Sequence, residues 1–72
     1  MNVISEYRML IKKEILKILK NYPEGLTITD VSKLLRIHYI TASKYLAVLE
    51  AEGQAVHRRI GMAKLFRLKE KS

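Results

Sequence analysis

The sequence predicts an α+β, mainly α domain in which three helices are followed by a two-stranded β-hairpin. Apolar residues recur at helical spacing in three segments, and cap or turn residues bound each segment. After Gly53, β-branched and aromatic residues alternate with basic ones around another glycine, a pattern typical of a hairpin. The 72 residues are 49% hydrophobic and include no cysteine, which suits one compact domain without disulfides.

The first helix is predicted over residues 5 to 20, where apolar side chains form one stripe. Its lysines fall mostly on the other side and are expected to form a solvated face; they are Lys12, Lys13, Lys17 and Lys20. Further apolar residues widen the stripe beyond what one small core needs, which indicates a surface for a partner. The residues assigned to that surface are Val3, Ile4, Tyr7 and Leu10.

A turn with the sequence NYPEG ends the first helix because Asn, Pro and Gly interrupt helices. Thr27 and Asp30 then have the spacing of a capping box, in which a hydroxyl and a carboxylate each bind a backbone N–H. A short second helix is predicted over residues 28 to 35.

The third helix is predicted over residues 39 to 52, ending at Gly53, which readily takes the left-handed conformation that closes a helix. At about 100° per residue, Ala42, Leu46 and Leu49 share one side of this helix. Ile40 and Lys44 point away from that side. One side must therefore pack, and the other faces water or a ligand.

The hairpin is predicted to pair residues 55 to 60 with residues 64 to 69, with its tip at Ile60 to Ala63. Val56, Phe66 and Leu68 are the expected inward anchors. Basic residues flank the tip, and they are Arg58, Arg59 and Lys64.

The charge balance favours a polyanionic partner. Fourteen Lys and Arg against seven Asp and Glu give a net charge of +7 on a small domain. A basic protein that is merely well solvated has the same balance, so charge alone leaves both interpretations open. No apolar run reaches the ~18 residues that a membrane span needs, and the amino terminus lacks a secretory signal, so a cytoplasmic location is expected.

The motifs occur in the order found in winged helix-turn-helix proteins. Residues 11 to 68 resemble small bacterial and archaeal winged-helix transcription regulators in GLT before the second helix, Ile37 in the turn, TASKYL in the third helix and LEAEG at its end. The resemblance implies that residues 1 to 72 form a single winged helix-turn-helix DNA-binding domain. It implies a sequence-specific regulator of transcription that binds double-stranded DNA, acts as a homodimer through its first helix and associates with the nucleoid.

In the family that this chain resembles, the helix corresponding to 39 to 52 lies in the major groove, and the hairpin, here 55 to 69, is a wing on phosphates or the minor groove. The residues implied to line the groove or read bases are Tyr39, Ile40, Ser43 and Lys44. His38 and Thr41 are implied to lie near the flanking phosphates, which the wing residues Arg58, Arg59 and Lys64 neutralise.

Structural alternatives exist for several of these residues. Tyr39 and Ile40 can instead close the edge of the core; the helical phase favours the groove for Ile40 and leaves Tyr39 undecided. His38 is either a substitute helix cap or a solvated side chain. Basic residues on a hairpin also protect its edges against aggregation.

Two residues depart from the family pattern. Arg36 stands where a glycine is common in the turn, so its Cβ predicts a strained or reshaped turn. His38 stands where Ser or Thr usually caps the third helix, and histidine is expected to cap less well.

Other functional classes find little support in the sequence. No nucleophile and base share a plausible spacing, and no glycine-rich loop offers a phosphate cradle, so an enzyme is not predicted. His38 and His57 lack the further ligands that a metal site needs, and no cofactor or small-molecule ligand is expected. The main alternative is a winged helix that serves as a protein-interaction module without sequence-specific DNA binding.

Overall fold

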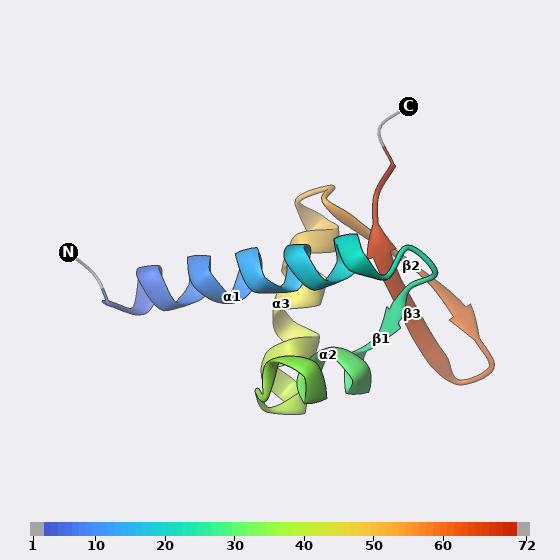
Figure 1. The fold of residues 1–72 in the computed structure, drawn as a ribbon, viewed down its shortest axis with the longest axis horizontal. Helices are drawn as coiled ribbons and strands as arrows, with labels where there is room; N and C mark the ends of the chain where they lie inside the picture. Colours follow the sequence, from blue (N-terminus) through green and yellow to red (C-terminus); the bar gives the residue numbers. More distant parts are fainter. Residues whose placement is uncertain (1–2, 71–72) are drawn as a thin grey trace.

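The computed structural model describes residues 3–70, with side chains from residue 6 onward. The protein is α+β and mainly α, as predicted, with three helices and a three-stranded antiparallel sheet in this part of the chain. The elements are α1 (Val3–Asn21), β1 (Leu26–Thr27), α2 (Ile28–Leu35), α3 (Tyr39–Ala51), β2 (Ala55–Ile60) and β3 (Ala63–Leu68). Figure 1 shows the first turns of α1 extending beyond the rest of the fold, with the sheet at the opposite end.

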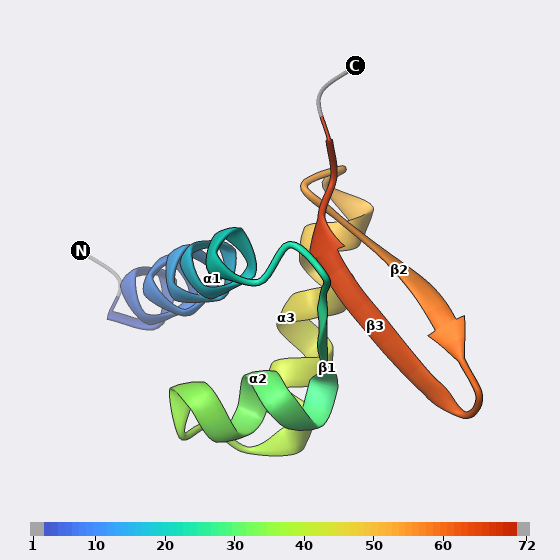
Figure 2. The same cartoon turned by 45° about the vertical axis from the view of Figure 1, so that its right-hand side comes forward.

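The core forms where α1, α2 and the sheet pack around α3 (Figure 2). Ile15, Leu46 and Leu49 have no exposed surface, and Leu19 and Phe66 are nearly as buried. The side of α3 predicted to pack is therefore the buried side. No helix within residues 3–70 has the length and apolarity that crossing a membrane requires.

The sheet contains a strand that the sequence did not predict. β1 pairs with β3, placing Leu26 opposite Phe66 and giving the strand order β1-β3-β2 instead of a two-stranded hairpin. With only two residues, β1 is too short to show an alternating pattern. Gly25 precedes it and takes a φ of +106°, a conformation that favours glycine.

The expected inward position of Val56 is wrong. β2 pairs with β3 so that Ala55 lies opposite Leu68 and Val56 lies opposite Arg67. Ala55 is buried, and Val56, one residue on, lies on the other face of the sheet, half exposed. A shift of one residue in strand phase exchanges the two faces, so the small Ala55 takes the core position that the larger valine was expected to fill.

The turn between α2 and α3 contains both unusual residues. Arg36 is left-handed, with φ 56° and ψ 44°, and closes α2 through bonds from its N–H to the carbonyls of Ser32 and Lys33. The turn is thus kept in the shape that glycine would take, at the cost of placing an arginine Cβ in the left-handed region. His38 caps α3, because its Nδ1 accepts a hydrogen bond of 3.1 Å from the N–H of Ile40. The role of substitute cap is confirmed.

Candidate nucleic-acid interface

The outward face of α3 is exposed and free of acidic side chains. Ile40 is 69% exposed at its start. Further along the same side come Lys44, Ala47 and Ala51, all exposed. The two alanines leave room for the helix backbone to approach a large ligand closely. From Val31 to Leu49 the sequence contains no Asp or Glu.

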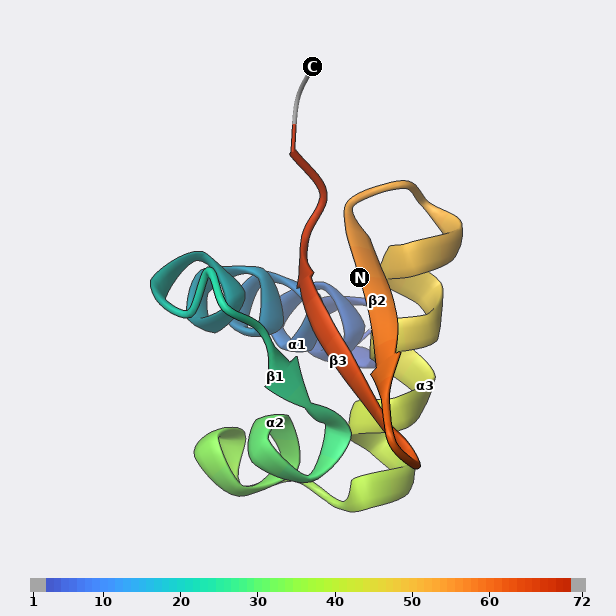
Figure 3. The same ribbon diagram turned by 90° about the vertical axis from the view of Figure 1, so that its right-hand side faces the viewer.

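A groove separates the first turns of α3 from the tip of the hairpin, which lies level with them in Figure 3. Its volume is about 630 Å³. Tyr39 and Ser43 line it from α3, and Lys64 lines it from β3. The structure therefore brings these three predicted residues together, and Tyr39, left undecided by its helical phase, is half exposed at the groove.

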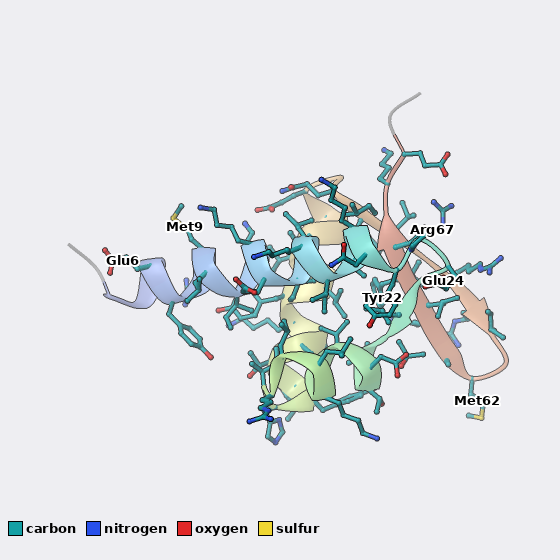
Figure 4. The ribbon with its side chains drawn as sticks, in the orientation of Figure 1. Glu6, Met9, Tyr22, Glu24, Met62 and Arg67 are labelled. Carbon is teal, nitrogen blue, oxygen red and sulfur yellow. The ribbon has the colours of Figure 1, made fainter. Side chains whose placement is uncertain are left out.

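The other residues of this groove were not predicted as part of a site, and Thr29, Ile60 and Met62 among them are exposed. Thr29 lines it from the first turn of α2, and Ile60 and Met62 line it from the hairpin tip. Met62 is 99% exposed and points away from the end of the hairpin in Figure 4. An apolar residue directly after Gly61 in a predicted turn was the available signal, since exposed tips are usually polar.

Lys44 lies apart from the groove. Its Nζ is 5.8 Å from the centre of the Tyr45 ring, and the side chain borders a smaller hollow shared with Arg8, Met9 and Lys12 of α1. Ser43 and Lys44 thus flank the outward face of α3 on its two sides, with Ile40 between them. Thr41 is half-buried, and His38 is exposed at the helix cap.

The hairpin cations occupy both faces of the sheet. Arg59 lies directly opposite Lys64, so these two positive side chains share one face, while Arg58 lies opposite Leu65 on the other. Like charges at directly opposite positions destabilise a strand pair. No salt bridge within residues 3–70 involves Lys44, Arg58, Arg59 or Lys64. An anion beside Arg59 and Lys64 would relieve their repulsion.

The carboxylates at the end of α3 are held by neighbouring side chains. Glu50 Oε2 lies 2.6 Å from Nδ1 of His57, whose ring packs against Phe66 at a centroid distance of 5.1 Å. Glu52 accepts from Lys12 Nζ at 2.7 Å. The Glu50–His57 contact was not predicted, because it joins a helix to a strand and depends on how the hairpin docks. It links β2 to the last turn of α3.

No family model matches the chain, and a search of curated proteins finds no match. Within residues 3–70, no group of three or more His, Asp or Glu side chains is placed to hold a metal ion.

The predicted partner surface on α1 is described in part. Tyr7 and Leu10 are 51% and 55% exposed on the projecting half of the helix (Figure 1). Val3 and Ile4 belong to α1, but their side chains lie outside the described residues. α1 is thus available to a partner over at least its second and third turns.

Proposed function

We propose that this chain is a winged helix-turn-helix regulator of transcription that binds double-stranded DNA with sequence specificity. α3 is the recognition helix and enters the major groove, and β2 and β3 form the wing. An α-helix with its side chains measures about 10–12 Å across, which matches a major groove about 12 Å wide.

The observation that carries the proposal is the unbalanced positive charge beside an exposed helix face. Arg59 and Lys64 repel each other across the wing, and both lie near the end of α3 that carries the exposed Ile40. DNA phosphates neutralise such a pair, while the outward face of α3 meets base edges. Ile40 packs against a thymine methyl, and Ser43 and Lys44 bind base edges, Lys44 at guanine N7 or O6. His38, Thr41 and Arg58 lie at the flanking phosphates.

A salt titration on random duplex DNA tests the proposal. Phosphate contacts by Arg58, Arg59 and Lys64 are expected to give a slope of about −3 per protomer in log K against log salt concentration. Fluorescence anisotropy with a labelled duplex measures it. If the duplex does not bind even at low salt, DNA recognition is excluded.

Helix and wing are expected to contribute differently to specificity. Lys44→Ala should relax preference at about one base position by ~1 to 3 kcal/mol, because it removes a base contact. Arg59→Ala should lower the affinity for duplexes of every sequence by the same factor, because phosphates carry no sequence information. Competition among single-base operator variants, selected first from a random duplex pool, measures both effects. The opposite result, with Arg59→Ala altering preference, would exchange the assigned roles of helix and wing.

The proposal includes a homodimer formed through α1, acting at the nucleoid in the cytoplasm. Two recognition helices must reach successive major grooves about 34 Å apart, which requires a second copy. The exposed Tyr7 and Leu10 provide an apolar contact on the projecting half of α1. Sedimentation at micromolar concentration is expected to show a dimer, and Leu10→Lys should shift it to monomer. A monomer that persists as concentration rises would contradict the α1 interface.

One observation favours the alternative, a winged helix that docks a protein. Tyr39, Ile60 and Met62 are large, exposed and largely apolar side chains that line one groove, as at protein interfaces. The salt titration separates the two functions, because a protein-docking module with no phosphate contacts lacks the steep salt dependence.

A further inference from the structure

A second groove lies on the other side of the molecule, between the carboxyl-terminal half of α1 and the end of β3. Its volume is about 1100 Å³. Leu16 and Leu68 form its apolar floor, and both also pack against the core. Leu68 pairs with Ala55 at the end of the hairpin opposite to the tip, so this groove shares no lining residue with the candidate DNA interface. We call it the α1–β3 groove.

Lysines dominate the rim of the α1–β3 groove. They are Lys13, Lys17 and Lys20 of α1 and Lys69 after β3, against only Glu14 and Glu70. No salt bridge within residues 3–70 involves any of these four lysines, whereas the neighbouring Lys12 is paired with Glu52. The sequence predicted a solvated lysine face on α1; in the fold, three of its lysines border an apolar floor.

The spacing of the lysines suits a ligand that carries negative charges at regular intervals along its length. Residues 13, 17 and 20 follow one another at four and three positions, so they lie on one side of α1 and span about 10 Å along its axis. An amphipathic helix with carboxylates at the same spacing can pair with this row while its apolar stripe covers Leu16 and Leu68.

We propose that the α1–β3 groove binds an acidic amphipathic helix of a partner protein. Charge complementarity selects this ligand over a second copy of the chain, since the exposed stretch from residue 6 to 10 carries one Glu and one Arg and is neutral overall. It also selects a helix over a nucleic acid, because a phosphate backbone offers nothing apolar to cover the leucine floor. The groove is distinct from the DNA interface, so both ligands can bind at once.

A synthetic peptide probe tests the proposal. The probe is a short helical peptide of Leu, Ala and Glu, with leucines along one stripe and glutamates beside it; the same peptide with Lys in place of Glu is the control. Amide chemical shifts of the full chain should change saturably along Lys13 to Lys20 and Leu68 to Glu70 with the acidic peptide alone. Shifts centred on the hairpin tip, or no saturable binding, would overturn the proposal.

Charge-reversal variants exclude a general attraction to this basic protein. Lys17→Glu is expected to lower the affinity for the acidic peptide about tenfold. It replaces an attraction with a repulsion at the middle lysine of the three on α1. Lys33→Glu makes the same charge change on the exposed surface of α2 and should alter the affinity less than about twofold. Equal losses in both variants would overturn the proposal.

Two further measurements separate this groove from the other proposed surfaces. The Lys17→Glu and Lys33→Glu variants should have equal affinities for duplex DNA. This comparison does not depend on how tightly the unmodified chain binds DNA. A selective loss of DNA binding in Lys17→Glu would assign the lysines to DNA and overturn the proposal. Concentration-dependent shifts in this groove without peptide would show that a second copy covers it, which would also overturn the proposal.

Discussion

Ile40→Glu is expected to weaken duplex DNA binding at least about 100-fold while the chain stays folded. Ile40 is 69% exposed, so the substitution removes little packing. If α3 enters the major groove, the new carboxylate lies among base edges and phosphates, where like-charge contacts cost several kcal/mol. Fluorescence anisotropy with a selected duplex measures the loss, and thermal unfolding followed by circular dichroism verifies the fold.

Met9→Glu is the matched control for this prediction. Met9 is 62% exposed on α1 and points away from α2 and the hairpin in Figure 4, so the same charge is added at a similarly exposed site. A loss of less than about fivefold is expected there. Met9 borders the hollow beside Lys44, so the new carboxylate can at most pair with Lys44 at the surface, and exposed ion pairs are worth about 0–1 kcal/mol. Equal losses in both variants would mean that net charge, not the face of α3, determines the affinity.

Long periodic elements could be predicted from the sequence. α2 has the predicted bounds, and α3 begins at the predicted residue and ends one residue early. Thirteen helical residues fix the phase of α3 well enough to place Ala42 and Leu46 inward and Ile40 outward. Tyr39 could not be placed, because a residue at the edge of the apolar stripe is oriented by its neighbours, here the hairpin tip across the groove.

Features that depend on how elements meet could not be predicted. β1 exists only because Leu26 and Thr27 reach the edge of β3. The phase of β2 depends on how the hairpin docks on α3. Ala55 is buried, and His57, on the same face of β2, contacts Glu50 of α3. Val56 lies on the other face. The candidate site shows the same division: the outward residues of α3 followed from helical phase, and the contribution of Met62 followed only from where the hairpin tip lies.

Gly25→Ala is expected to lower the free energy of unfolding by about 2–4 kcal/mol, through strain in the backbone and crowding at the sheet. The residue has a φ of +106°, which L side chains rarely adopt. A Cβ built there would lie 2.7 Å from Cγ of Leu65 and 3.1 Å from the carbonyl oxygen of Phe66. Because Gly25 has no Cβ, the chain can pass close to β3 just before β1, and β1 can pair with β3. Urea denaturation followed by circular dichroism measures the change.

Gly53→Ala separates the two causes, because it changes the same atoms without the crowding. Gly53 has a φ of +78°, and a Cβ there would meet no atom within 4 Å. Its substitution is expected to cost about 1–2 kcal/mol from the left-handed backbone alone. If Gly25→Ala lowers the free energy of unfolding by more than this, the excess has two sources. One is the crowding between the added Cβ and Leu65, and the other is the extra backbone strain at the larger φ of Gly25. If the two variants were equally stable, the contact with Leu65 would yield without cost, and β1 would not depend on a glycine for its place in the sheet.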